Sequence, residues 1–340
     1  CKILLALKAF SMHAMFPLMI PYLQGICASS PFEARLGREE FGKEVHTFAP
    51  AYSESDIAHL ITTSDAIIFN SLWQWDHYQD RIPQHIRCGL RINPEYSEVD
   101  VEIYNPCSTS SRLGIKVNQL PKELPEGISG LHFHALCEQN ADTLQRALKA
   151  VENKFGRYLH KIQWINFGGG HHITRKDYDL ELLIQLIKQF KKKYNIEVYL
   201  EPGEAVALNT GVLMATVLDI LPNDIPNAIL DTSAEAHMPD VLAMPYRPEI
   251  IDADEPGKLP FTYKLGGVTC LAGDIIGDYS FRQKLKRGDK LLFTDMAHYT
   301  MVKTTMFNGI QHPSIAVLTE NNTVDIVRKF TYEDFKNRLS

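Results

Sequence analysis

The segment WINFGGG at residues 164–170 is followed by DYDLELLIQLIKQFKKKYN at 177–195 and by EVYLEPG at 197–203. The first and third stretches are short apolar runs that end in turn residues, which is typical of buried strands. In the second stretch the apolar residues recur with the spacing of one helix face. A strand, a helix and a second strand in this order form the unit from which parallel sheets are built. This part of the chain is therefore predicted to have an α/β fold.

Similar short apolar runs recur from the start of the chain up to this segment. They are ILLALKAF (3–10), GICAS (25–29), EVHTFA (44–49), AIIFNS (66–71), CGLRIN (88–93) and GLHFHA (130–135). Together with the two runs above they make eight, and helical segments such as NADTLQRALKAVENKFG (140–156) lie between several of them. Eight such units in about 210 residues have the size of a (β/α)₈ TIM-type barrel. A doubly wound sheet stays open as an alternative, because alternation alone does not reveal closure.

The composition and the hydrophobic pattern of the sequence change after residue 210. From there on the chain consists of β-branched and aromatic runs punctuated by Gly and Pro, with no helix of comparable length. We therefore expect a barrel over residues 1–210 and a C-terminal, mostly β and barrel-like domain over residues 211–340.

Composition excludes several classes of function. The 35 Lys and Arg residues against 41 Asp and Glu give a net charge of −6, and there is no basic run of the kind that binds nucleic acid. No apolar stretch approaches the length of a membrane span. The six cysteines lack CxxC spacing, which favours a reducing compartment, so a cytoplasmic protein is expected. The chain begins without Met and almost inside its first strand, which indicates that an N-terminal segment is missing.

Unusual residues fall at or just past the ends of several predicted strands, where barrel enzymes keep their functional groups. These residues are Lys8, Arg91, His134, Gly168, Gly169, Gly170 and Glu201. Their shared position predicts that they meet at one end of the barrel.

Lys8 stands near the end of the first run. If its side chain points into the barrel, loss of hydration lowers its pKa toward neutrality, and a neutral amine can form a Schiff base with a carbonyl group. The alternative is an ordinary lysine whose stem lies along the strand end and whose ammonium reaches solvent.

Two interpretations are possible for the glycines and two for Glu201. Gly168–Gly170 either form a plain turn or let backbone N–H groups approach a phosphate. Glu201 is either a surface carboxylate or the partner of a protonated ring nitrogen. The His132 and His134 pair would suit a metal, but no third ligand has an obvious spacing, so no metal site is predicted.

The C-terminal domain contributes further candidates. Cys270 is either a small buried apolar residue or a reactive thiol. The acidic segment DTSAEAHMPD (231–240) is either a solvated loop or part of an acidic pocket for a polyamine.

The strings that carry these residues resemble those of the alanine-racemase-type (fold type III) pyridoxal-phosphate decarboxylases. The matching strings are LALKAFS, GLHFHALCE, INFGGGHHIT, LEPGE, AEAHMPDVL and GGVTCLAGDIIGDY. They occur in the order of the family's motifs, and the resemblance covers essentially the whole chain.

The resemblance implies a cofactor, pyridoxal 5'-phosphate, and a role for each matching residue. Lys8 would form the Schiff base with the cofactor, His134 would stack on its ring, and Glu201 would bind its pyridine nitrogen. Gly168, Gly169, Gly170 and Tyr299 would also contact the cofactor. Cys270 would be the acid, delivered from the partner subunit of a homodimer with shared active sites.

Two departures from the wider family bear on the substrate. Glu204 stands where ornithine and diaminopimelate decarboxylases have an arginine, and Leu271 stands where the diaminopimelate enzymes have a glutamate. Both favour a polyamine substrate with several ammonium groups, for which Glu235 and Asp274 are the first candidates. The alternatives are another amino-acid decarboxylase of the group, of diaminopimelate or ornithine/arginine type, or a non-catalytic protein that binds the cofactor.

Overall fold

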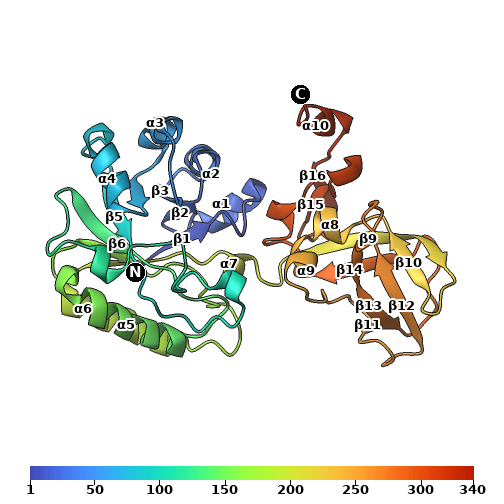
Figure 1. The fold of residues 1–340 in the computed structure, drawn as a ribbon. Coiled ribbons are helices and arrows are strands. Elements are labelled where there is room, and N and C mark those ends of the chain that lie inside the picture. The colour runs from blue at the N-terminus through green and yellow to red at the C-terminus, as the bar shows by residue number, and fades with distance from the viewer. The chain divides into compact units, whose positions relative to one another are not determined.

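The computed structural model describes residues 1–340, which form two compact units, Cys1–Val206 and Ala207–Ser340 (Figure 1). The sequence had indicated a boundary between residues 210 and 211. Each unit is described below by itself.

The first unit is built on a closed barrel of eight parallel strands. In barrel order they are β1 (Lys2–Ala6), β2 (Gly25–Ala28), β3 (Glu44–Phe48), β4 (Ala66–Phe69), β5 (Arg87–Arg91), β6 (Ile128–His132), β7 (Trp164–Asn166) and β8 (Glu197–Leu200). The barrel closes where β1 pairs with β8, with Lys2 opposite Tyr199. The predicted barrel is thereby confirmed, and a doubly wound sheet is excluded.

Helices follow most of the strands. They are α1 (Phe16–Met19), α2 (Pro31–Leu36), α3 (Glu54–Thr63), α4 (Leu72–Tyr78), α5 (Ala141–Leu159), α6 (Leu180–Tyr194) and α7 (Glu204–Ala207). Helix α6 begins where the Asp179 carboxylate accepts a hydrogen bond from the Leu182 N–H, and it ends at the left-handed residue Asn195. Short 3₁₀ turns of this unit lie at His13–Met15, Gln79–Arg81, Glu102–Tyr104 and Val117–Gln119, and a π turn lies at Gly37–Phe41. None of the helices in the chain combines the length and the apolar character that crossing a bilayer requires.

A tryptophan fills the middle of the barrel. The indole of Trp164 on β7 is 1% exposed and donates a hydrogen bond to the Ser129 hydroxyl at 3.1 Å. A Cβ atom at Gly130 would lie 2.0 Å from this indole, and one at Gly89 would lie 2.5 Å from it. The neighbouring strands β5 and β6 therefore need glycine at these positions to admit the ring.

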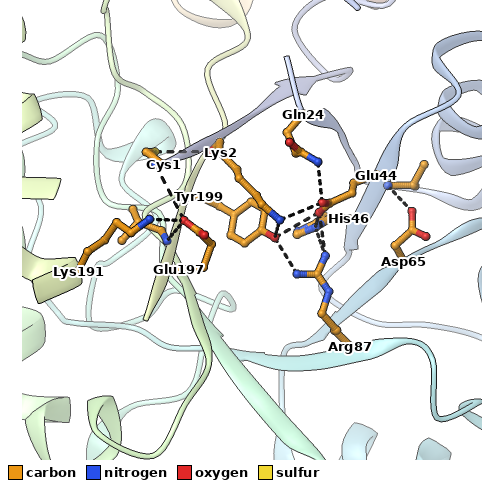
Figure 2. Close-up of polar contacts among 12 residues, drawn as sticks. Cys1, Lys2, Gln24, Glu44, His46, Asp65, Arg87, Lys191, Glu197 and Tyr199 are labelled. Atoms are coloured by element: carbon orange, nitrogen blue, oxygen red, sulfur yellow. Dashed lines mark hydrogen bonds and ion pairs between the residues drawn. The ribbon is translucent and has the colours of Figure 1, made fainter. Parts of the chain in front are cut away.

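A network of polar side chains closes the end of the barrel at which the strands begin (Figure 2). The Glu44 carboxylate accepts hydrogen bonds from the Lys2 ammonium at 3.1 Å, the Arg87 guanidinium at 2.8 Å and the Tyr199 hydroxyl at 3.2 Å. Burial alone would raise the pKa of Glu44, but the neighbouring His46, Lys2 and Arg87 outweigh it and hold the pKa well below its ordinary value. Burial also lowers the pKa of His46, which favours the neutral ring. This end of the barrel is therefore held by a structural network of paired charges around Glu44.

Replacing Glu44 by glutamine should destabilise the barrel, because it leaves Lys2 and Arg87 half-buried without a counter-charge. We expect the free energy of unfolding at pH 7 to fall by about 2 kcal/mol. In the wild type, ionised Glu44 stabilises the fold above the ordinary carboxyl pKa, and this contribution is lost as the pH falls toward the lowered folded value. The lowered pKa of His46 also makes the fold less stable as the pH falls below the ordinary histidine pKa. The Glu44→Gln variant should therefore lose less stability on acidification than the wild type.

Urea-induced unfolding at pH 7 and pH 3, followed by circular dichroism, measures both effects, because pH 3 lies between the ordinary carboxyl pKa and the lowered folded value. Glu39→Gln is the matched control, because Glu39 pairs with Arg35 on the exposed surface of the unit, where such pairs contribute less than about 1 kcal/mol. Equal unfolding midpoints for the two variants would contradict the structural role of Glu44.

The second unit contains a six-stranded mixed sheet in the order β11-β13-β12-β10-β9-β14. The strands are β9 (Val212–Leu221), β10 (Asn227–Leu230), β11 (Ala253–Asp254), β12 (Phe261–Gly266), β13 (Ile275–Phe281) and β14 (Lys290–Thr294). Strands β10 and β12 are parallel and the other neighbours are antiparallel. The prediction of a mostly β second domain is confirmed.

The remaining elements of this unit are short. Strands β15 (Ile315–Leu318) and β16 (Val324–Arg328) form a separate antiparallel ribbon. The helices are α8 (Ala234–His237), α9 (Asp240–Ala243) and α10 (Tyr332–Lys336), and 3₁₀ turns lie at Met301–Lys303 and Phe307–Gly309.

Candidate active site

The predicted residues of the first unit gather at the carboxyl ends of the barrel strands. Glu201 directly follows β8, Gly168 lies two residues past β7, His134 two residues past β6 and Lys8 two residues past β1. Because all eight strands are parallel, these positions share one end of the barrel, opposite the network around Glu44.

Lys8 lies in a turn and not in the first strand. The predicted run continued to Phe10, but β1 ends at Ala6, whose carbonyl accepts hydrogen bonds from the N–H groups of both Ala9 and Phe10. The Lys8 side chain is exposed in this chain, so the loss of hydration expected from an inward-facing strand position does not occur. Its ammonium still acts on the site, because it helps to lower the pKa of Glu201 and of His134.

Glu201 is a mostly buried carboxylate, 11% exposed, with a polar contact on each oxygen. The Asn166 side-chain amide donates to its Oε1 at 2.7 Å, and Nε2 of His132 lies 3.3 Å from its Oε2. Burial would raise the pKa of Glu201, but His132 and Lys8 outweigh this effect and hold it at about 2. Glu201 is therefore ionised at neutral pH and can accept a hydrogen bond from a cationic ring nitrogen.

Asn166 connects Glu201 to the glycine loop. Its carbonyl oxygen accepts a hydrogen bond from the Gly168 N–H at 2.8 Å, so its amide nitrogen is the group that faces Glu201. The Glu201 N–H in turn donates to the Gly168 carbonyl at 2.8 Å. Sequence reasoning missed Asn166, although its place at the end of the seventh strand, two residues before the first glycine of the loop, was a usable signal.

The three glycines are required by close packing of the loop on its own chain. A Cβ atom at Gly168 would lie 2.5 Å from the Phe133 carbonyl oxygen, and one at Gly170 would lie 2.0 Å from that of Leu136. Both residues also have positive φ angles, 74° and 80°.

The three backbone N–H groups of the glycine loop are not equally free to bind a ligand. The Gly168 N–H is used by Asn166, and the Gly169 N–H donates to Nδ1 of His134 at 3.0 Å. The Gly170 N–H has no acceptor within the chain. It is therefore the amide of the three that can bind a phosphate oxygen.

The hydrogen bond from Gly169 also defines the state of His134. Because Nδ1 accepts a hydrogen bond from the Gly169 N–H, the neutral ring carries its own hydrogen on Nε2. Burial and the Lys8 ammonium hold the pKa of His134 well below its usual value. An uncharged ring fixed at one nitrogen is suited to stacking on a flat ligand, because it brings no positive charge to a cationic ring.

Two further side chains add charge and shape to the site: Arg91, which was predicted to lie at this end of the barrel, and Cys27, which was not. Arg91 at the end of β5 is 6% exposed, and its guanidinium lies over the Phe48 ring at 4.5 Å without an ion pair. Burial lowers the pKa of Arg91 to about 10, so it remains a cation. Cys27 on β2 lies near Glu201, and burial together with that carboxylate raises the pKa of its thiol well above the usual value.

Glu204, which departs from the family pattern, has a partner in the first unit. Its Oε1 lies 3.6 Å from Nε2 of His172, and this contact raises the pKa of His172. No group of three His, Cys, Asp or Glu side chains in the chain is arranged to bind a metal.

The other predicted residues lie in the second unit. Cys270 is exposed on the loop between β12 and β13, and its N–H donates to the Asn308 side chain at 2.7 Å. Tyr299 has a left-handed backbone with φ of 47°, and the Lys303 ammonium lies over its ring at 5.6 Å.

Asp274 and Glu235 differ sharply in their surroundings. Asp274 is 4% exposed, and its carboxylate accepts five hydrogen bonds from its own unit. The Glu235 side chain is half-buried in the first turn of α8. Of the two predicted substrate ligands, only Glu235 has a carboxylate without such a set of internal donors.

Comparison with known proteins adds three findings. Residues 69–297 match the family model described as "Pyridoxal-dependent decarboxylase, C-terminal sheet domain". A carboxynorspermidine/carboxyspermidine decarboxylase of Campylobacter jejuni is 46% identical, over 99% of this chain and 91% of the relative. A carboxyaminopropylagmatine decarboxylase of Synechocystis is also 46% identical, over 99% of this chain and 88% of the relative.

A solved structure is similar along the same length. The crystal structure of carboxynorspermidine decarboxylase from Campylobacter jejuni in complex with norspermidine superposes with a TM-score of 0.92 at 44% identity. The match covers 99% of this chain and 92% of that one.

Proposed function

Because this chain belongs to the pyridoxal-dependent decarboxylases, we propose that it removes the α-carboxylate of carboxynorspermidine or carboxyspermidine and releases the corresponding polyamine. The observation that carries the proposal is the full-length likeness to an enzyme crystallised with norspermidine. The assignment to carboxynorspermidine/carboxyspermidine decarboxylases also agrees with the motif strings of the sequence. The chain is an enzyme of pyridoxal-phosphate chemistry, so a non-catalytic binding protein is no longer an alternative.

The first unit has the groups that this cofactor needs. Its phosphate would be held by the free Gly170 N–H, its ring would lie against neutral His134, and its pyridine nitrogen would donate to ionised Glu201. Lys8 would carry it covalently. When bound, pyridoxal phosphate supplies a ring that accepts the electron pair left behind as carbon dioxide departs.

The protein's own groups provide orientation and proton transfer. Glu201, supported by Asn166 and His132, would keep the proton on the ring nitrogen. Cys270 would deliver a proton to the α-carbon once the carboxylate has left, and Tyr299 would also contact the cofactor. Glu235 would bind an ammonium group of the substrate.

We propose a homodimer with shared active sites in the cytoplasm. The β15–β16 ribbon leaves Leu318, Val324, Ile326 and Val327 between 47% and 69% exposed, and an isolated two-stranded ribbon is marginal in water. A second copy of the chain would cover these side chains, and sedimentation analysis tests this. All six cysteines are free, as is usual in a reducing compartment.

The Synechocystis relative supports a second candidate substrate. Carboxyaminopropylagmatine also carries a carboxylated aminopropyl group on a secondary amine, but it ends in a guanidinium. The two named relatives are equally similar to this chain, so the distal end of the substrate is the point to be tested.

The test is parallel measurement of kcat/KM for carbon dioxide release from carboxynorspermidine, carboxyspermidine and carboxyaminopropylagmatine, with diaminopimelate as the control. We expect the first two to differ by less than about 100-fold, because one methylene changes binding by about 1–3 kcal/mol. The agmatine derivative should react at least about tenfold more slowly than the better of them. A higher kcat/KM for that derivative would overturn the assignment in favour of the second candidate.

A further inference from the structure

Asp274 lies between the two segments of the second unit to which the proposed function gives chemical roles. We infer that Asp274 is a positioning residue that holds the loop carrying Cys270 and the helix carrying Glu235 in a single arrangement. This inference rests on the proposed function for the roles of Cys270 and Glu235. It replaces the expectation that Asp274 binds a substrate ammonium.

The hydrogen bonds of the carboxylate reach both segments. From the helix segment, the Ser233 hydroxyl donates to Oδ2 at 2.9 Å, and the N–H groups of Ala234 and Glu235 donate to Oδ1 at 2.8 and 3.2 Å. From the loop, the N–H and the hydroxyl of Thr269 donate to Oδ2 at 3.1 and 2.7 Å. Two segments that lie about 35 positions apart in the sequence are thus joined through one buried group.

On the loop side, the hydrogen bonds to Asp274 come from Thr269, the residue directly before Cys270. The backbone also passes close to the carboxylate, since a Cβ atom at Gly267 would lie 2.3 Å from Oδ2 of Asp274. The Cys270 N–H itself is held by the Asn308 side chain at 2.7 Å. The position of the thiol therefore depends on Asp274 on one side and on Asn308 on the other.

On the helix side, the hydrogen bonds to Asp274 hold the start of α8, a helix too short to be stable alone. Helix α8 has four residues, and helices of that length do not form without support. Its first N–H groups have no partners inside the helix, and Asp274 accepts two of them. One of these belongs to Glu235, so the carboxylate fixes the backbone from which the proposed amine ligand projects.

A substrate ammonium has little access to a carboxylate in this state. Both oxygens are occupied, and the residue is 4% exposed. Recruiting Asp274 to the substrate would leave several buried donors without an acceptor, which is unfavourable. The consequence is a coupling: a change at Asp274 should disturb proton delivery and amine recognition together.

The test uses three substitutions in the full-length enzyme. Asp274→Asn weakens both sides, and Thr269→Val removes the hydroxyl bond on the loop side. Ser233→Ala removes the hydroxyl bond on the helix side together with the N-cap bond that the same hydroxyl accepts from the Ala236 N–H. Asp278→Asn on the following strand is the matched control, because no side-chain hydrogen bond of the second unit depends on its carboxylate. Hydrogen exchange of residues 233–237 and 268–273 is measured by mass spectrometry, and kcat and KM are measured separately.

For Asp274→Asn we expect amide exchange to accelerate by about tenfold in both segments, the factor that corresponds to one lost hydrogen bond to a carboxylate. We expect kcat to fall and KM to rise together, each by about tenfold. Thr269→Val should loosen residues 268–273 and lower kcat, whereas Ser233→Ala should loosen residues 233–237 and raise KM.

Other outcomes would overturn the inference. A rise in KM alone, with exchange in both segments unchanged, would make Asp274 a substrate ligand. Faster exchange without any change in kcat or KM would leave it a purely structural residue. Should Asp274→Asn fail to fold, the two single-sided variants still decide the question. Should none of the candidate substrates react, the proposed function fails, while the exchange data still decide whether Asp274 joins the two segments.

Discussion

Replacing Lys8 by alanine should lower turnover by on the order of 10³-fold or more, because the proposed covalent attachment of the cofactor depends on this amine. The fold should be unaffected, since Lys8 lies exposed in a turn after β1 and substitutions at such sites change the stability by less than about 0.5 kcal/mol. Reduction with borohydride followed by peptide mass spectrometry measures the attachment directly. In the wild type, the peptide that contains Lys8 should gain the mass of the reduced cofactor.

Lys149→Ala is the control for this experiment, because Lys149 is exposed on α5. That variant should retain both the modified Lys8 peptide and normal turnover. If the Lys8→Ala protein keeps near-normal turnover, or if the wild-type label appears on a different lysine, the assignment of Lys8 is wrong.

Replacing Glu201 by alanine should reduce kcat by about 10²–10³-fold, the size of effect found when one preorganised electrostatic group is removed from an active site. Cofactor affinity should change by less than about tenfold, because the phosphate contact and the His134 ring are unaffected. Glu201→Gln should be nearly as inactive as Glu201→Ala, since a neutral amide cannot hold a proton on the ring nitrogen. Equilibrium dialysis gives the affinity, and carbon dioxide release gives kcat.

The state of Glu201 also predicts the pH profile. Its pKa of about 2 means that the carboxylate is ionised throughout the working range, so no loss of activity between pH 5 and 8 should come from its protonation. Glu181→Gln on the exposed face of α6 is the matched carboxylate control and should leave kcat unchanged. Equal kcat values for Glu201→Ala and this control would exclude Glu201 as the partner of the ring nitrogen.

The eight barrel strands could be predicted because each is a short apolar run, but their ends could not. In ILLALKAF the residues after Ala6 stay apolar while the backbone turns away, and hydropathy does not distinguish a strand from a buried turn. Strand β13 has no continuous apolar run, because Gly277 and Asp278 interrupt its pattern, so hydropathy does not reveal it.

The candidate site was predicted in position but not in its contacts. Lys8, His134 and Glu201 could be placed because parallel strands bring their carboxyl ends together. The support of Glu201 by Asn166 joins residues 35 positions apart, which no local pattern reveals. For the same reason the hydrogen bonds that Asp274 accepts from Ser233 and Ala234 could not be predicted from GGVTCLAGD, because these donors come from a distant segment.

The two glycine amides that His134 and Asn166 already occupy also bear on how the enzyme acquires its cofactor. A loop tied down before the cofactor arrives has given up its conformational freedom during folding, so little further entropy is lost when the phosphate binds. We therefore expect the apoenzyme to bind the cofactor without rearranging this loop, so that the occupancy of the site follows the concentration of the vitamin-derived cofactor.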